Sequence, residues 1–138
     1  MARERKEIIT SSNAPPPVGP YSQGVALGGR GTFSRPVRQL VFLSGQVGRK
    51  PDTTELEKGV AAQTRQAILN MQAVLAETNL TLADVVKTTV FLAEMNDFAE
   101  MNAVYAEFFD ENAAPARSTI EVARLPLDAL MEIEAIAS

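Results

Sequence analysis

The side chains best suited to chemistry lie in the last quarter of the chain. Arg117 opens a strand-like run, and Glu132 and Glu134 stand at strand spacing near the end of the sequence. An arginine at the mouth of one extended segment and a carboxylate inside another could bind a small carboxylate substrate and transfer a proton beside it. Taken alone, an arginine is more often a surface ion-pair partner, and a structural role for Glu132 is slightly preferred.

The residue types that the chain lacks restrict its chemistry. It contains no cysteine and no histidine. Thiol nucleophiles, disulfides, imidazole catalysis and the common zinc sites are therefore excluded within one chain. A metal site would have to consist of carboxylates alone.

Length and composition indicate one globular domain over residues 1–138. A chain of 138 residues with 46% hydrophobic content can bury about two-thirds of its unfolded surface in one core. No apolar run follows the charged N-terminus, as a secretory signal requires, and no stretch approaches membrane-spanning length. We therefore expect a soluble, cytoplasmic protein without membrane association.

The net charge of −4 is distributed unevenly. Residues 1–50 carry a net charge of +6, and residues 51–138 carry −10. The basic side chains are scattered, and no aromatic residues are interleaved with them to stack bases, so we do not expect nucleic-acid binding. We interpret them as solvated charges of a long hairpin, whose tip lies between Gly28 and Leu40, with acidic neighbours on another subunit as potential partners.

Hydrophobic periodicity alternates between strand and helix along the chain. The expected strands cover residues 7–10, 25–27, 38–44, 85–92, 117–123 and 130–137.

Two helices are expected between these strands. A capping-box arrangement at Thr54-Glu55-Leu56-Glu57 precedes the first helix, and Asn79 marks its end. The second helix begins near Asn96 or Asp97, where Asp97-x-x-Glu100 matches the same motif. Its expected buried face comprises Phe98, Met101, Tyr105, Phe108 and Phe109.

The order of these elements predicts an α/β (α+β) sandwich of two layers, with a mixed sheet and both helices on one of its faces. The other face would expose more apolar surface than soluble monomers tolerate. We therefore expect an oligomer whose strands line its centre.

Short motifs follow one another along nearly the whole chain. They are Ala14-Pro15, Gly19-Pro20-Tyr21-Ser22-Gln23, Ser44-Gly45-Gln46, Gln63-Thr64-Arg65-Gln66, Asn70, Asp84-Val85-Val86-Lys87-Thr88-Thr89-Val90-Phe91-Leu92, Asp97-Phe98, Asn102-x-x-Tyr105, Pro115-Ala116-Arg117-Ser118, Glu121-Val122-Ala123-Arg124-Leu125-Pro126 and Glu132-Ile133-Glu134-Ala135-Ile136-Ala137. Each motif is weak alone, but the ordered set resembles the RidA family. This family is also called the YjgF or reactive-intermediate deaminase family, and formerly the L-PSP endoribonuclease family.

The resemblance implies a homotrimer of chorismate-mutase-like subunits, with a central sheet-lined barrel and a small-molecule cleft at each subunit boundary. It also implies the hydrolytic deamination of reactive enamines and imines, such as 2-aminoacrylate and 2-aminocrotonate, to 2-keto acids and ammonia. No cofactor and no metal are implied. The expected partners are a small carboxylate-bearing substrate and further copies of the chain.

The two catalytic residues implied by the resemblance are Arg117 and Glu132. Arg117 offers a planar fork of donors that matches the substrate carboxylate bidentately. Glu132 corresponds to the family's catalytic glutamate; in a partly dry cleft it would orient or deprotonate a hydrolytic water and return a proton to the departing amine.

The resemblance also implies substrate-binding residues. Tyr21 would line the cleft, and the Ser44-Gly45 pair would let backbone N–H groups approach the ligand closely. Thr119 stands where many relatives have cysteine and would contribute its backbone amide to the carboxylate. Asn102 would fix a loop or a wall of the cleft.

Two other functions remain alternatives at this stage. An endoribonuclease, as the older family name suggests, would need acid-base groups and phosphate affinity, which a chain without histidine and with net negative charge supports weakly. A non-catalytic carboxylate-binding or chaperone-like trimer would have the same fold but would not need the catalytic role of Arg117.

Overall fold

The computed structural model describes residues 6–28 and 39–138, and its elements follow the expected order. Most of the basic hairpin tip and the expected strand start at Arg38 lie outside the described residues. The strands and helices are β1 (Glu7–Ile9), β2 (Gly24–Leu27), β3 (Leu40–Val47), α1 (Val60–Ala76), β4 (Val85–Leu92), α2 (Phe98–Phe108), β5 (Ala116–Glu121) and β6 (Met131–Ala137).

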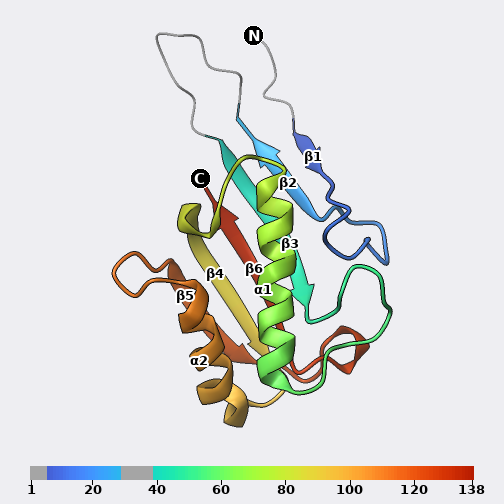
Figure 1. Cartoon of the computed structure of the whole chain (residues 1–138), viewed down its shortest axis with the longest axis vertical. Helices are drawn as coiled ribbons and strands as arrows, with labels where there is room; N and C mark the ends of the chain where they lie inside the picture. The colour runs from blue at the N-terminus through green and yellow to red at the C-terminus, as the bar shows by residue number, and fades with distance from the viewer. Residues whose placement is uncertain (1–5, 29–38) are drawn as a thin grey trace.

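The strands form one mixed sheet in the order β1-β2-β3-β6-β4-β5. All neighbouring pairs are antiparallel except β4 and β5, which run parallel. The last strand of the chain, β6, therefore lies between β3 and β4 at the centre of the sheet (Figure 1). Its burial on the helix side explains why Met131, Ile133, Ala135 and Ala137 are all apolar.

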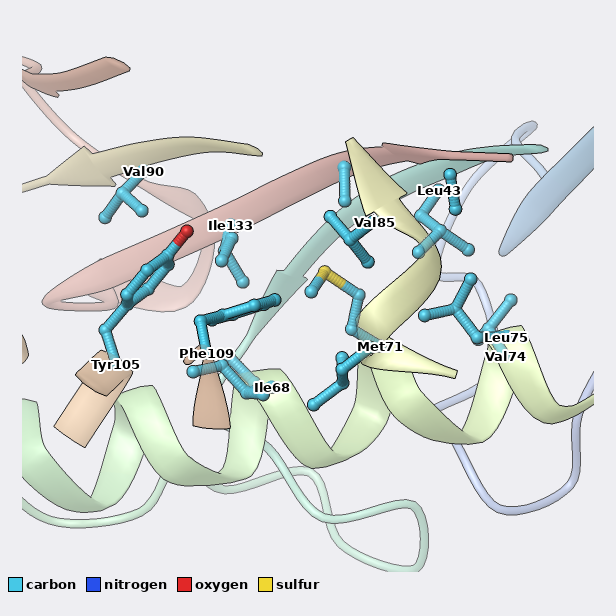
Figure 2. Packing of buried hydrophobic residues seen from close by; sticks show 14 of the residues in the cluster. Leu43, Ile68, Met71, Val74, Leu75, Val85, Val90, Tyr105, Phe109 and Ile133 are labelled. Carbon is cyan, nitrogen blue, oxygen red and sulfur yellow. The ribbon is translucent and has the colours of Figure 1, made fainter. Parts of the chain in front are cut away.

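Both helices cover the same face of the sheet, which confirms the expected α+β sandwich (Figure 1). The core lies between α1 and the central strands, where Ile68, Met71 and Leu75 are fully buried. Figure 2 shows these side chains pointing from the helix toward Leu43 and Ile133 of the sheet. Burial of each such side chain contributes about 1.5–3 kcal/mol, so this interface supplies much of the stability of the fold.

The expected capping box at Thr54-Glu55-Leu56-Glu57 is wrong, because α1 begins only at Val60. The backbone of the expected cap is engaged elsewhere. Leu56 forms an isolated bridge with Arg49, and the Glu57 N–H donates to the Gly48 carbonyl at 2.8 Å. Gly59 precedes the helix with φ 86°, a conformation that favours glycine.

The second helix starts where expected but without the expected cap. A short 3₁₀ turn, Met95–Asp97, leads into α2, and the Asp97 side chain caps no backbone N–H. The expectation that Phe98 lies in the buried face is wrong: it is the first residue of α2 and is 36% exposed. Neither described helix is both long and apolar enough to cross a membrane.

The sheet face opposite the helices carries apolar side chains. Leu40, Phe42 and Ile120 are among the exposed large hydrophobic residues. The strand register places Phe42 beside Ile136 and Val25, and Ile120 beside Phe91, so these residues share the face that the helices leave open. The open face thus carries an apolar cluster, as the sequence predicted, beside polar side chains such as Lys87, Thr89 and Glu134.

Buried Gln23 fixes the proline-rich segment that follows β1. Its side-chain carbonyl accepts from the Ser11 N–H at 2.6 Å, and its amide nitrogen donates to the carbonyls of Ser11 and Pro15 at 3.0 and 2.9 Å. Proline supplies no backbone donor, so this segment has few other ways to be anchored. This one side chain thus supplies several of the hydrogen bonds that position the proline-rich segment.

Replacing Gln23 with Leu is expected to lower the free energy of unfolding by about 2 kcal/mol or more, because several buried backbone groups lose their partner. Urea unfolding measures the change. The matched control is Gln72→Leu, since Gln72 is exposed on α1. An equal, small effect of both substitutions would contradict the anchoring role of Gln23.

Candidate functional site

Three connections that are distant in sequence enclose a cleft of about 400 Å³. They are the proline-rich segment after β1, the segment from the end of β3 toward α1, and the loop before β6, and all lie at the same side of the molecule in Figure 1. The lining residues are Pro15, Pro16, Val18, Tyr21, Gln23, Ser44, Gly45, Gln46, Val47, Arg49, Pro126, Leu127, Glu132 and Glu134. Four of the predicted site residues are among them.

Ser44 and Gly45 lie in an irregularity of β3 that opens this cleft. The register between β3 and β6 shifts between Leu43 and Gln46, as in a β-bulge. Ser44 donates its hydroxyl to the Ser22 carbonyl, and its N–H donates to the Gln23 carbonyl at 2.9 Å. The irregularity leaves the strand backbone beside the cleft instead of continuing the ladder with β6.

Gly45 is required by the close approach of Glu132. A Cβ atom at this position would overlap the Glu132 carboxylate. The glycine therefore allows the carboxylate to lie against the strand backbone, and any larger residue would displace it.

Glu132 extends from β6 into the cleft, on the sheet face opposite the helices. It pairs with Val47 on one side and with Phe91 on the other. Burial raises the pKa of its carboxyl group above the ordinary value, and the negative charge of Glu134 raises it further. Such a group holds its proton to a higher pH than an ordinary carboxyl group does, which suits it to accept a proton and return it.

Tyr21 stands at the mouth of the cleft. Its hydroxyl accepts a hydrogen bond from the Val18 N–H at 3.3 Å, which links the Tyr21 side chain to the backbone of its own loop. The ring remains half exposed, so it presents both an apolar face and a polar tip to the cleft.

Arg117 lies elsewhere, in a second group of predicted residues beside α2. Its guanidinium carbon is 4.6 Å from the ring centroid of Tyr105 and 5.6 Å from that of Phe98. None of the ion pairs in the described residues includes Arg117. A guanidinium that rests on aromatic faces keeps its in-plane N–H donors available for an anion.

Buried Tyr105 is the platform of this group. Its hydroxyl is 2.8 Å from Thr88 Oγ1, and Figure 2 shows it pointing toward the sheet. Burial raises the pKa of the Tyr105 hydroxyl, while the bond to Thr88 and the charge of Arg117 lower it to a smaller extent. The Tyr105 ring is therefore held by its own backbone at one end and by the hydrogen bond with Thr88 at the other, beneath the Arg117 guanidinium.

Thr119 and Asn102 belong to the same side of the molecule as Arg117. Thr119 follows Arg117 by two residues on β5, so the two side chains share a face. Its Oγ1 is buried and has no hydrogen-bond partner within the described residues. Asn102 lies on α2 between Phe98 and Tyr105, at i+4 and i+7 spacing that places all three on one helix face.

The strand register separates the two groups onto opposite faces of the sheet. Arg117 pairs with Thr88, which is fully buried against Tyr105 on the helix side. Glu132 pairs with Phe91, three residues farther along the same strand, and so it points to the open face. One chain thus brings Tyr21, Ser44, Gly45 and Glu132 together but does not bring Arg117, Thr119 or Asn102 to them.

Sequence reasoning missed other residues of the cleft wall. Gln46 follows the Ser44-Gly45 pair and was recognised only as part of a motif. The expectation that the basic side chains of residues 1–50 are solvated is wrong for Arg49, because only 8% of this residue is exposed. No local pattern signals this burial, since it depends on the proline-rich segment folding over the end of β3. The described residues contain no group of three His, Cys, Asp or Glu side chains that could hold a metal ion.

Replacing Glu132 with Gln is expected to stabilise the fold more at pH 7 than at pH 4. The pKa of Glu132 is higher in the folded than in the unfolded protein, so the wild-type protein loses stability as the pH rises from the unfolded-state pKa through the folded-state pKa. At low pH the carboxyl group is protonated in both states, and this loss is absent. Urea unfolding at both pH values measures the difference, with exposed Glu111→Gln as the control. The same difference at both pH values would contradict the raised pKa.

Comparison with known proteins shows which proteins this chain resembles. A RutC family protein of Pyrococcus horikoshii is 48% identical, over 96% of this chain and 97% of the relative. A protein of Escherichia coli named 2-iminobutanoate/2-iminopropanoate deaminase is 47% identical, over 95% of this chain and 96% of the relative. The crystal structure of E. coli TdcF with bound serine matches with a TM-score of 0.80 and 41% identity, covering 95% of this chain and 97% of that chain.

The sequence model of the family described as Endoribonuclease L-PSP matches residues 11–138. This match includes the cleft, the β5 strand and both predicted catalytic positions. The chain therefore belongs to the endoribonuclease L-PSP family, which is the RidA/YjgF family that its motifs resemble.

Proposed function

We propose that the chain hydrolyses reactive enamines and imines, such as 2-aminoacrylate and 2-aminocrotonate, to 2-keto acids and ammonia. The observation that carries this proposal is Glu132, a partly buried carboxyl group of raised pKa in a cleft with Tyr21 and Gly45. The similarity to a protein named 2-iminobutanoate/2-iminopropanoate deaminase supports the same reaction class. A relative with bound serine supports a substrate that carries a carboxylate and an amine.

The substrate carboxylate requires a cation, and Arg117 is the residue best prepared to provide it. Its donors face no carboxylate among the described residues, and Tyr105 holds the guanidinium in place. Because Arg117 and Glu132 occupy opposite faces of one sheet, we propose that a second copy of the chain supplies Arg117 to each cleft. Thr119 and Asn102 would accompany it from the same copy.

The open face of the sheet supports such an assembly. Phe42 is 38% exposed there, and Ile120 is 45% exposed. Apolar side chains on a regular sheet gain by burial against another copy, which favours closed rotational symmetry. We propose a homotrimer in which the open faces surround the centre and the clefts lie at the boundaries between copies.

The proposed reaction needs only proton transfers and a water molecule. The enamine first tautomerises to the imine, whose C2 atom is the electrophile. Glu132 takes a proton from water as the oxygen bonds to C2, and it returns a proton to the nitrogen. Glu132 then takes the hydroxyl proton of this carbinolamine and passes it to the amino nitrogen. The C–N bond breaks as the oxygen forms the carbonyl, so ammonia and the 2-keto acid leave.

Positioning supplies most of the acceleration, because these imines already hydrolyse in water. Arg117 fixes the carboxylate bidentately and so fixes the orientation of C2 relative to Glu132. The raised pKa of Glu132 suits both directions of its proton transfer. Gly45 contributes by allowing the carboxylate to lie in the cleft wall.

The cleft does not favour cleavage of RNA. Among the described residues, its lining holds two carboxylates, Glu132 and Glu134, against one cation, Arg49, so it lacks the several basic side chains that bind a phosphate backbone. A small substrate with one carboxylate brings less negative charge and can be held by a single arginine.

A mixing experiment tests whether two chains complete each cleft. Arg117→Ala alone is expected to lose activity because the carboxylate is not held, and Glu132→Gln alone is expected to slow turnover because water is not deprotonated. When the two variants are unfolded together and refolded, about a quarter of the clefts in random trimers regain both residues. A dehydratase-coupled assay of keto-acid release measures the recovery.

The control is a mixture of the two variants refolded separately and combined without unfolding, which should stay inactive. A co-refolded mixture that is no more active than this control would place Arg117 and Glu132 within one chain's site. Retained activity of Arg117→Ala by itself would overturn the role of Arg117.

A charge on the open face is expected to dissociate the assembly. Phe42→Glu introduces a carboxylate among buried apolar side chains in the proposed trimer, so sedimentation velocity should detect monomers. Leu69→Glu is the matched control, because Leu69 is 41% exposed on the outer side of α1. A Phe42→Glu protein that sediments like the Leu69→Glu protein would contradict the proposed interface.

A further inference from the structure

Arg49 is a buried cation in the wall of the cleft. It follows β3, and only 8% of the residue is exposed. Its Nη2 donates to the Pro16 carbonyl at 3.2 Å, and the side chain lines the same cavity as Glu132 and Tyr21. The proposed reaction assigns no role to this arginine.

The structure holds the backbone of Arg49 firmly. The Asn70 side-chain amide donates to the Arg49 carbonyl at 2.8 Å and to the Val47 carbonyl at 3.2 Å, from the buried side of α1. The isolated bridge to Leu56 fixes the same residue from the other side. Its guanidinium is therefore placed by three separate segments rather than by a free loop.

No carboxylate neutralises this guanidinium in the described part of the chain. The ion pairs there are Lys50–Glu57, Arg65–Glu107 and Arg124–Asp128, all between side chains that are much more exposed. A buried charge without a counterion is costly, and a backbone carbonyl compensates only part of that cost. The arrangement is therefore unusual for a residue with a purely structural role.

The remaining guanidinium donors of Arg49 are not fully buried. Among the described residues, the only fully buried side-chain nitrogen or oxygen without a partner is Thr119 Oγ1. The nitrogens of Arg49 that make no hydrogen bond therefore keep some exposed surface, and the cavity that Arg49 lines is the cleft. A guanidinium presents these donors in a plane that matches a carboxylate.

The two carboxylates of the cleft do not occupy these donors. Neither Glu132 nor Glu134 forms an ion pair with Arg49. The raised pKa of Glu132 follows from burial and from Glu134, and Arg49 is not among its causes. The positive charge thus lies at a separate position in the same cavity.

We propose that Arg49 is a second anion-binding position of the cleft, and that it binds the distal carboxylate of dicarboxylic imino acids such as 2-iminosuccinate and 2-iminoglutarate. This inference rests on the proposed function, in which Arg117 of a second copy holds the first carboxylate. The part of the cavity that one chain lines measures about 400 Å³, which lies in the range of about 300–1,000 Å³ typical of small-molecule sites and leaves room for a second carboxylate.

Binding of stable keto acids tests the site without catalysis. Isothermal titration calorimetry compares 2-oxoglutarate with 2-oxoglutaramate, in which an amide of the same size replaces the distal carboxylate. The wild-type protein is expected to bind 2-oxoglutarate at least about tenfold more tightly, as one charge-assisted arginine contact provides. Equal affinity of the two compounds, or binding of neither, would overturn the proposal even if no variant folded.

Variants then assign the preference to Arg49. Arg49→Gln is expected to remove the tenfold preference, whereas Arg49→Lys retains part of it because the charge remains. Lys50→Gln is the matched control, since it removes the same charge from the neighbouring residue, which does not line the cleft. A folded Arg49→Gln protein with the wild-type preference would show that Arg49 only fastens the proline-rich segment.

Turnover separates failure of this inference from failure of the proposed function. An L-aspartate oxidase with catalase generates 2-iminosuccinate, and a threonine dehydratase generates 2-iminobutanoate. Arg49→Gln should lower kcat/KM for 2-iminosuccinate at least about tenfold more than for 2-iminobutanoate. Equal losses for both would overturn the role of Arg49 alone, whereas a wild-type protein that hydrolyses neither imine would overturn the proposed function.

Discussion

The alternation of side chains along the central strands is the constraint on which the rest of this protein depends. Thr88 and Phe91 lie three residues apart on β4 and so face opposite sides of the sheet, and their partners Arg117 and Glu132 do the same. Neither side chain can cross the sheet to the other face. A reaction that needs both groups at one small anion therefore links catalysis to assembly.

Each face supports one of the two proposed catalytic residues by different means. On the helix side, aromatic rings from α2 hold the Arg117 guanidinium, and the bond from Tyr105 to Thr88 fixes the ring against the sheet. On the open side, irregular backbone at Gly45 makes room for the Glu132 carboxylate. Because Arg117 and Glu132 lie on opposite faces of the sheet, they do not form an ion pair with each other within one chain.

Amide side chains organise the loops around the cleft. Gln23 holds the proline-rich segment from one side. Asn70 and Gln63 both lie on α1. The Asn70 side chain holds the end of β3. The Gln63 side chain accepts a hydrogen bond from the Leu130 N–H at 2.8 Å, and this bond positions the start of β6. These contacts connect the stable helix–sheet core to residues such as Glu132 and Arg49. The cleft is thus as rigid as the elements that carry its anchors.

The sequence by itself determined the order of the elements, because hydrophobic spacing of two or of about three and a half residues reflects local backbone geometry. It also predicts Arg117 and Glu132 as catalytic residues, because their types and motifs are readable without coordinates. The start of α1 at Val60, the exposure of Phe98 and the burial of Arg49 were decided only by the tertiary structure. Each of these features depends on contacts between segments far apart in the chain. Strand pairing across the sheet also sets the face to which each candidate site residue points, and no local pattern contains this pairing.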